Sequence, residues 1–510
     1  MHIEVHRAGI STLPVEILAE IFWHCVPDAA TFQDPVLWTH QAHPLNAPIL
    51  LTRVSRYWRE IALNTPSLWS SLSLADGACG GIRVVDAYLS ALKTWLSLSQ
   101  SLPLRIKLDA ENHYSIMITY LSLLCDEADR WNEVYLESCH PTHFQTSHKS
   151  SFPILTSLSL KLTSTDYGHT QFPVFFDALS SAPNLRRVDI TFHSMAGLPL
   201  PWSALTEYAF RCTHHYLPIL DLPQFVVEMR KCHSLTKALF EITEGVSSCW
   251  IKVALDGDMN DNLRRATLPR LLHLTISTDD TNVLDALFDS LSAPSLEHIT
   301  IQSTDQYGSP WGQSNNLALK GFLASCADSL TSIQVEIPAN MIPAGLLIEV
   351  LRDLPSLLTM YFIGPDDYLY WSHVLDALVS RGHQGTNLRL RSFGVHINSW
   401  FRHREPRRHR RNAYDHVVHS YRGNKHDPDD QKLFFDSLKA MVESRLPPIH
   451  ALDEQSGSAS YTSLAGHLET LRVSSKIFSD AEGLASEPSA NMLQLWSAGG
   501  LRLEITPSRE

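Results

Sequence analysis

Leu155-Thr156-Ser157-Leu158-Ser159-Leu160 sets the repeat from which the fold of this 510-residue chain follows. The spacing Leu-x-x-Leu-x-Leu puts alternate apolar side chains of a short strand on one face. Apolar residues recur at nearly the same positions in seven later stretches, which begin at Leu185, Leu205, Leu235, Leu271, Leu296, Leu330 and Leu357. Neighbouring first leucines are 20 to 36 residues apart, a period typical of stacked repeats. Each repeat is therefore predicted to contribute one strand.

The segments between these strands carry apolar residues at helical spacing, and several end in proline. Helical faces are predicted at Phe175/Phe176/Leu179, Leu284/Leu287/Phe288/Leu291 and Leu347/Val350/Leu351/Leu354. Proline ends a helix and favours an extended chain before the next strand, as at Pro183, Pro269, Pro294 and Pro355. Such units cannot bury their apolar faces alone, so we expect them to stack. The predicted fold class is α/β, an irregular solenoid in which an arc of parallel strands has helices outside.

Weaker matches extend the array in both directions. They begin at Leu104 and Trp131 before it, and at Leu390 and Leu468 after it. We also expect a helix over 86–95, an amphipathic helix over 432–445, and a last helix and strand between 495 and 505. The predicted organisation is a small all-helical domain (1–75), a connecting helix with the first irregular repeats (76–150), the main array (151–396), a charged loop insertion (397–430), and C-terminal repeats with a cap (431–510).

Residues 1–75 are predicted to contain two amphipathic helices joined by a loop insertion at 27–47. Pro14 fits a first helical turn, and Glu16 lies near the positive end of the helix dipole. The apolar face of this helix carries Ile17, Leu18, Ile21, Phe22 and Cys25. The second helix is expected to begin near Asn46 or Pro48 and to end at Asn64, with Leu50, Leu51, Val54, Trp58 and Ile61 on its apolar face. Helices of this length bury too little surface to be stable alone, so these faces cover each other, the rest of the chain or a partner.

The order of short motifs in this region resembles the F-box-like domain of many fungal proteins. Between Ile10 and Leu74 the motifs are Leu-Pro, Glu-Ile-Leu, Ile-Phe, Val-Ser-Arg, Trp-Arg and Leu-Trp. The resemblance implies docking to the Skp-family adaptor of a cullin ubiquitin ligase complex. The adaptor-binding residues that it implies are Leu13, Pro14, Ile17, Leu18 and Ile21, with Val54, Trp58 and Ile61 completing the helical cluster and its contact edge. The insertion at 27–47 is longer than the short turn usual in the family.

The array in turn resembles the leucine-rich repeats of F-box substrate receptors. In that family an Asn or Cys usually follows each strand, and its replacement here predicts irregular loops. The replacing residues are Thr163, His193, Thr213, Thr243, Asp279, Thr304, Pro338 and Pro365. The resemblance implies a substrate receptor that holds an unknown target protein on the array for ubiquitin-dependent degradation. Aromatic residues are enriched at binding hot spots but are more often part of a core, and the candidates for that contact are Tyr208, Phe210, Tyr361, Tyr368 and Trp371. The alternative is a protein-interaction scaffold whose helices cap the solenoid and never reach a cullin complex.

Composition limits the other functions. A net charge of −13 and a pI near 6.0 argue against nucleic-acid binding, which needs a basic surface. No apolar run approaches the ~20 residues of a membrane span, the cysteines form no CxxC pair, and the N-terminus shows no secretory leader. We therefore expect a protein of the cytoplasm, the nucleus or both. The basic stretch Arg402–Arg411 is interpreted as an import signal, a contact for an acidic partner, or a solvated loop.

Catalytic and metal-binding patterns are missing from the sequence. The histidines that follow Cys139 and Cys212 have no second cysteine pair nearby to complete a zinc site. The chain contains no Gly-x-Ser-x-Gly, no Gly-x-Gly-x-x-Gly and no phosphate-binding loop. The acidic pairs Asp279-Asp280 and Asp366-Asp367 fall in expected loops, where paired charges are commonly solvated. We expect no enzymatic activity, no cofactor and no bound metal.

Overall fold

The computed structural model describes residues 10, 13–26, 46–75, 85–109, 114–139, 151–162, 174–192, 198–212, 222–242, 265–278, 281–302, 317–336, 344–364, 368–379, 389–397, 428–445, 468–474, 497 and 501–506. The chain forms two compact units, residues 1–211 and residues 212–510. Most of the predicted insertion at 27–47, the basic stretch Arg402–Arg411, and the eight residues that replace the repeat Asn or Cys lie outside the described residues.

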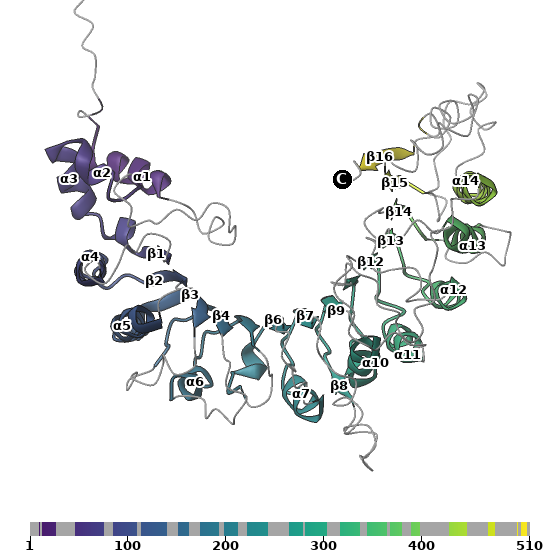
Figure 1. Cartoon of the computed structure of the whole chain (residues 1–510), viewed down its shortest axis with the longest axis horizontal. Coiled ribbons are helices and arrows are strands. Elements are labelled where there is room, and N and C mark those ends of the chain that lie inside the picture. Colours follow the sequence, from purple (N-terminus) through teal and green to yellow (C-terminus); the bar gives the residue numbers. More distant parts are fainter. Residues whose placement is uncertain are drawn as a thin grey trace, which may run out of the picture. The chain divides into compact units, whose positions relative to one another are not determined.

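The first unit begins with helices and continues as parallel strands (Figure 1). An N-terminal helical cluster consists of α1 (Val15–Cys25), α2 (Leu51–Val54), α3 (Arg56–Leu63) and the 3-10 turn η4 (Pro66–Trp69). The strands follow one another in chain order: β1 (Ser71–Ala75), β2 (Leu104–Asp109), β3 (Trp131–Cys139), β4 (Ser157–Leu162), β5 (Arg187–Thr191) and β6 (Glu207–Cys212). On one face of these strands lie α4 (Val85–Leu98), α5 (Tyr114–Cys125) and α6 (Val174–Leu179), while the turns η6 (Ala128–Arg130) and η8 (Trp202–Ala204) precede β3 and β6.

The second unit repeats this plan of parallel strands with helices on one face. Its main strands, again parallel and in chain order, are β7 (Lys237–Ile242), β9 (His273–Thr278), β11 (His298–Gln302), β12 (Ser332–Glu336), β13 (Thr359–Gly364), β14 (Ser392–Ile397), β15 (Thr470–Ser474) and β16 (Arg502–Thr506). The helices lie on one face of them: α7 (Leu222–Met229), α10 (Thr281–Ser290), α11 (Leu317–Ser325), α12 (Ala344–Arg352), α13 (Tyr368–Leu378) and α14 (Pro428–Glu443). The face of each unit's strands away from its helices is called the strand face below.

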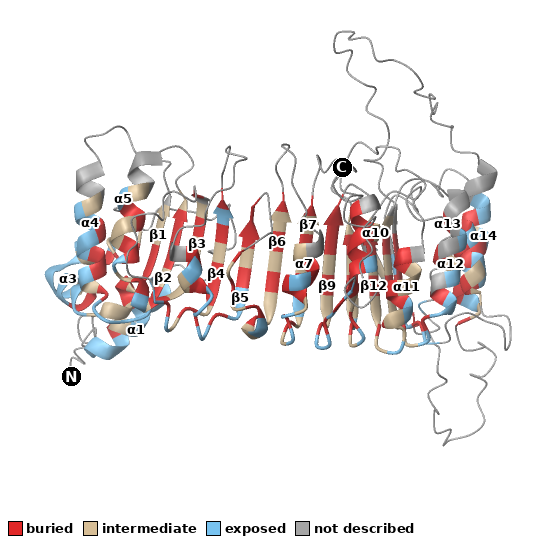
Figure 2. Cartoon of the chain, turned by 90° about the horizontal axis from the view of Figure 1, so that it is seen from below, coloured by how far each residue is buried: buried red, intermediate tan, exposed pale blue. Residues whose placement is uncertain are grey.

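The repeat motif forms the core of both units. The first leucine of all eight motifs is fully buried, as the predicted spacing requires: Leu155, Leu185, Leu205, Leu235, Leu271, Leu296, Leu330 and Leu357. The two apolar strand positions that follow each leucine are also buried, and they alternate with more exposed residues along each strand (Figure 2). The predicted mixed α/β fold with a large parallel sheet is therefore confirmed.

Main-chain hydrogen bonds join neighbouring repeats at the turn before each strand. The carbonyl oxygen of Thr156 accepts bonds from the backbone N–H groups of Arg186 and Arg187, at 3.0 and 3.1 Å. The corresponding carbonyl oxygens each accept two N–H groups of the following repeat in the same way, at Arg186, Thr236, Leu272, Glu297, Thr331, Leu358 and Arg391. Because main-chain bonds do not depend on the side chain, this connection tolerates the varied residues found at the position.

Several weaker predictions are also confirmed. Strands β2, β3, β14 and β15 fall on the weaker motif matches, and α4 and α14 cover the helices expected at 86–95 and 432–445. The strand expected near 505 is β16. Of the last helix expected near 495, only Ser497 is among the described residues.

Three local predictions are wrong. Ser71–Ala75, placed in an all-helical region, forms β1, because its register with β2 buries Leu72. The single second helix is two helices, because the hydroxyl of Ser55 accepts a bond from the N–H of Trp58 at 3.1 Å and begins α3 afresh. Leu291, expected on a helix, lies in the short strand β10 (Leu291–Ser292), which pairs with β8 (Ala266–Thr267).

Candidate partner-docking surface

A small apolar core holds the N-terminal helical cluster together. Leu18 and Phe22 of α1 are fully buried, and the Phe22 ring lies 4.8 Å from the ring of Trp58 on α3. Leu18 and Phe22 are four residues apart, so they share one face of the helix. Ile61 of α3 is also buried. The cluster is therefore a packed element rather than a set of separate helices.

The tryptophan pair Trp69 and Trp95 links the cluster to the first repeats. The indole N–H of Trp69 donates to the carbonyl oxygen of Ala62 at 2.8 Å, and the Trp69 ring meets that of Trp95 on α4 edge to face at 4.9 Å. Leu68 beside it is fully buried. These contacts fix the position of η4 between the helices and β1, so the cluster is anchored to the strands of its own unit.

The predicted adaptor-binding residues divide into exposed and buried groups. Ile17, Ile21 and Val54 are exposed by 49%, 38% and 54%, and Pro14 is exposed as well. Leu13 and Trp58 are half-buried.

Leu18 and Ile61, in contrast, are exposed by only 0% and 4%. The prediction that these two residues contact an adaptor is corrected, since their side chains fill the core of the cluster and present no surface to a partner. Helical spacing alone did not distinguish the buried strip from its flanks.

Exposed apolar side chains are concentrated on this cluster. Among the described residues, nine of the twelve exposed large hydrophobic side chains lie between positions 10 and 63, and these are Ile10, Val15, Ile17, Ile21, Trp23, Leu50, Val54, Tyr57 and Leu63. The remaining three, Leu102, Val227 and Leu433, are scattered through the other described residues. Single exposed apolar residues are normal, whereas this concentration makes the helical cluster a candidate docking surface.

Helix α1 carries exposed apolar side chains on both sides of its buried strip. At 100° per residue, Ile17 and Ile21 lie on one flank of the Leu18 and Phe22 strip, whereas Val15 and Trp23 lie on the other. The sequence prediction missed Val15 and Trp23. The signal in the sequence is the width of the apolar arc of this helix, which is wider than a single packed strip requires.

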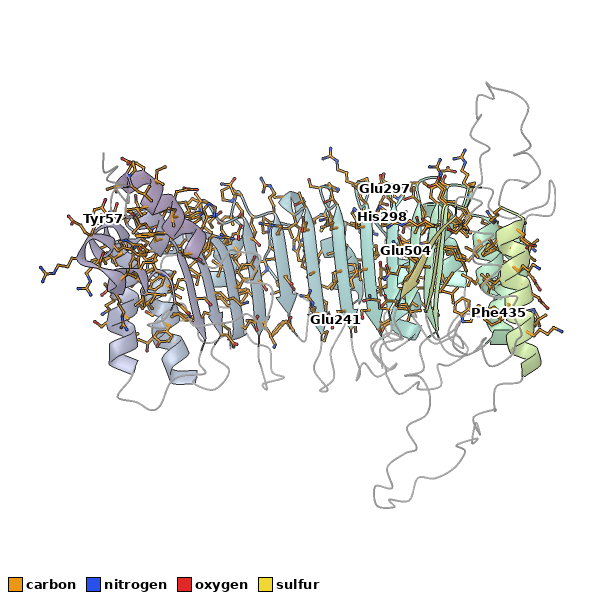
Figure 3. The ribbon with its side chains drawn as sticks, turned by 90° about the horizontal axis from the view of Figure 1, so that it is seen from above. Tyr57, Glu241, Glu297, His298, Phe435 and Glu504 are labelled. Carbon is orange, nitrogen blue, oxygen red and sulfur yellow. The ribbon has the colours of Figure 1, made fainter. Side chains whose placement is uncertain are left out.

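Charged groups border the apolar surface. Arg53 and Arg56 are exposed on α2 and α3, and the guanidinium of Arg59 donates to the carbonyl oxygen of Thr52 at 2.8 Å. The polar face of α1 carries Glu20, whose carboxylate lies 3.4 Å from the imidazole of His24. Tyr57 projects from α3 at the surface of the cluster (Figure 3). The cluster therefore exposes apolar and charged side chains together, a composition that protein-binding surfaces also have.

Most of the aromatic residues suggested as target contacts belong to the core. Tyr208, Phe210 and Trp371 are buried, with the Tyr208 ring 5.2 Å from Trp202 and the Trp371 ring 5.1 Å from Phe362. The side chain of Tyr368 lies outside the described residues. Only Tyr361 is half-buried on a strand face, in β13.

Candidate metal ligands and reactive thiols are limited in the described parts of the chain. No three His, Cys, Asp or Glu residues come together there in a way that holds a metal ion. Burial raises the pKa of the Cys232 and Cys326 thiols to about 12, and it raises the pKa of Cys139 further. Such thiols stay protonated near neutral pH, which makes them packing residues rather than nucleophiles.

The histidines that follow Cys139 and Cys212 and the acidic pairs Asp279-Asp280 and Asp366-Asp367 lie outside the described residues. Among the described helices, none combines the length and the apolar character needed to cross a membrane.

No protein-family model matches this chain, and no curated protein is similar to it in sequence. The function of the helical cluster and of the strand faces is therefore inferred from their exposed side chains.

Proposed function

We propose that this protein is the substrate-recognition subunit of a Skp-cullin-F-box ubiquitin ligase. In this proposal the helical cluster is an F-box that docks the Skp-family adaptor, and the repeats form an irregular leucine-rich-repeat solenoid that holds a target protein. The observation that carries the proposal is the concentration of exposed apolar side chains between Ile10 and Leu63, next to a repeat array. A surface of this kind needs a partner to cover it.

The mechanism is positional. Ubiquitin transfer is performed by other subunits in the cytoplasm or nucleus, and this chain raises the effective concentration of a target beside them. No catalytic group of its own is required. The proposed adaptor contacts are the exposed residues Pro14, Ile17, Ile21 and Val54, with the half-buried Leu13 and Trp58 at the edge.

Co-purification with a Skp-family adaptor tests the proposal. Replacing both Ile17 and Ile21 by aspartate puts two charges into the exposed flank of α1, and we expect the adaptor affinity to fall by about 100-fold or more. The matched control is Leu433→Asp, because Leu433 is exposed to a similar extent on α14. Equal loss of adaptor in the control, or an intact protein that binds no Skp-family adaptor, contradicts the proposal.

A second candidate is a scaffold in which the helical cluster serves as the cap of the solenoid. The contact between Trp69 and Trp95 favours it, because that contact attaches the cluster to the first repeats. In this case the double aspartate variant keeps its partners, and cells lacking the protein show no change in the turnover of the proteins that it binds. Proximity labelling with the proteasome inhibited distinguishes the two candidates.

A further inference from the structure

The side chains of helix α1 form four rows along the helix, because residues four apart lie nearly above one another. One row, made of Leu18 and Phe22 with Val26 just past the helix end, is buried against the rest of the helical cluster. The three remaining rows carry all of the exposed side chains of the helix (Figure 2). These three rows together are the surface that α1 offers to a partner.

A charged row runs along the middle of this surface. It consists of Glu16, Glu20 and His24, and all three side chains are exposed. The carboxylate of Glu20 lies 3.4 Å from the imidazole of His24, whereas Glu16 makes no ion pair with any described residue. Both carboxylates are therefore accessible to a cation of a partner protein.

Apolar rows border the charged row on both sides. Ile17 and Ile21 form the isoleucine row on one side, and Val15 and Trp23 form the tryptophan row on the other, where they are exposed by 49% and 39%. At 100° per residue, Ile17 and Trp23 are about 120° apart around the helix axis, and Glu20 lies midway between them. A flat partner surface that covers the isoleucine row therefore leaves the tryptophan row in water.

One partner covers both apolar rows only if it surrounds the helix. With its side chains a helix is about 10–12 Å wide, so two separate proteins on the two rows would collide over the charged row. The isoleucine row already belongs to the proposed adaptor contacts, and the tryptophan row lies on the same helix of 11 residues. Continuity along one short helix makes the adaptor the occupant of both rows.

We propose that the adaptor receives α1 in a groove with two apolar walls and a lysine or arginine on its floor. One wall covers the isoleucine row, the other covers the tryptophan row, and the basic group pairs with Glu16 and Glu20. A carboxylate enclosed between apolar walls loses its water, so a floor without a cation would disfavour docking. Salt screens such enclosed pairs less than exposed ones. The inference rests on the proposed function, and it specifies the shape and charge of the adaptor surface.

Footprinting of the full chain, alone and with a purified Skp-family adaptor, tests the groove. Hydroxyl-radical oxidation reports on Trp23, and alkylation reports on Cys25, which is exposed and follows Ile21 by four residues on the isoleucine side. We expect the adaptor to protect both residues in peptide mass spectrometry. Protection of only one of them overturns the groove and leaves adaptor docking in place, whereas protection of neither overturns both proposals.

Trp23→Ala tests the second wall by affinity. We expect it to weaken adaptor binding by about tenfold or more, because it removes a large apolar contact from the interface. Leu102→Ala is the matched control, since Leu102 is exposed to a similar extent, 36%, and lies outside the helical cluster. Thermal unfolding of both variants checks that they fold. Unchanged affinity in Trp23→Ala, or an equal loss in Leu102→Ala, overturns the inference.

The double variant Glu16→Gln and Glu20→Gln tests the floor of the groove. We expect adaptor binding to weaken by about tenfold through loss of charge-assisted pairs. The matched control is Glu349→Gln with Glu443→Gln, which removes two glutamates that are 56% and 54% exposed on α12 and α14. Equal or tighter adaptor binding by the α1 variant would mean that the floor carries no cation, and this result overturns the inference.

Discussion

Leu18→Ala separates the buried strip of α1 from its exposed flanks. Leu18 is fully buried against the helical cluster, and removing such a side chain costs about 2–5 kcal/mol through lost burial and the cavity that remains. Ile17, the preceding residue on the same helix, is half exposed, so Ile17→Ala is expected to cost no more than about 0.5 kcal/mol. Both variants introduce alanine into α1, so the helix propensity of the new residue is the same in the two and does not account for a difference between them.

Hydrogen exchange measured by mass spectrometry over α1 and α3 is the suitable assay, because it reports local opening without requiring the whole chain to unfold in one step. A loss of about 2–5 kcal/mol raises exchange by about 30- to 4,000-fold in Leu18→Ala if opening of the cluster limits exchange. Ile17→Ala is expected to leave the rate nearly unchanged and to weaken adaptor binding instead. Similar exchange in the two variants would refute the assignment of Leu18 to the core and of Ile17 to the surface.

Three further predictions concern the strands. Glu133→Gln removes the carboxylate that Arg105 and Arg187 share, and we expect the first unit to lose about 1 kcal/mol, less at high salt, in denaturant titrations. Gly394→Ala forces the Tyr361 ring to move and is expected to cost about 1–3 kcal/mol; most of this cost should vanish in a Tyr361→Ala background, and an unchanged cost there would contradict the contact. Burial lowers the pKa of Lys107 to about 8. The unfolded chain then binds more protons between pH 8 and about 10.5, so the Lys107 contribution to stability rises with pH across this window. Lys107→Met should remove that rise, and an identical pH profile in the two proteins would count against it.

The strands were predictable because the repeat places its information in local spacing. Alternate residues of a strand lie on one face, so packing that face buries the apolar residues of the motif together, and all eight first leucines are fully buried. The bonds that join the repeats come from the main chain, as at Thr156, so variation in the turn residues does not change the fold. Local pattern and long-range packing agree at these positions.

Features that depend on contacts distant in sequence were not predictable in the same way. The break at Ser55 follows from one hydroxyl that competes for the start of α3, within a run of residues that reads as a continuous helix. The neighbours of Gly394 in the sheet are Tyr361 and Arg472, and each lies in a different repeat. The spacing of residues along the sequence does not show which residues of different strands become neighbours. It also does not show which side chain occupies the space beside a glycine that has none.

The same limit applies to the candidate docking surface. Leu18 and Ile17 are both apolar positions of one amphipathic helix, and only the packing of Phe22 and Trp58 determines which of the two is covered. An apolar face wider than the core that it meets leaves its flanks exposed. The contact residues of the proposed docking are then those at the margins of the pattern, such as Ile17 and Ile21, and the residues at its centre contribute to folding.

Salt tests which force holds the adaptor in the proposed complex. Contacts through Ile17 and Ile21 remove apolar area from water, and added NaCl does not weaken that contribution. Pairs between exposed charges, in contrast, are screened as the Debye length falls from about 10 Å at 0.1 M salt to about 3 Å at 1 M. Raising NaCl is therefore expected to leave the adaptor bound. Release of the adaptor at 1 M NaCl would mean that charge, rather than apolar burial, holds it on the helical cluster.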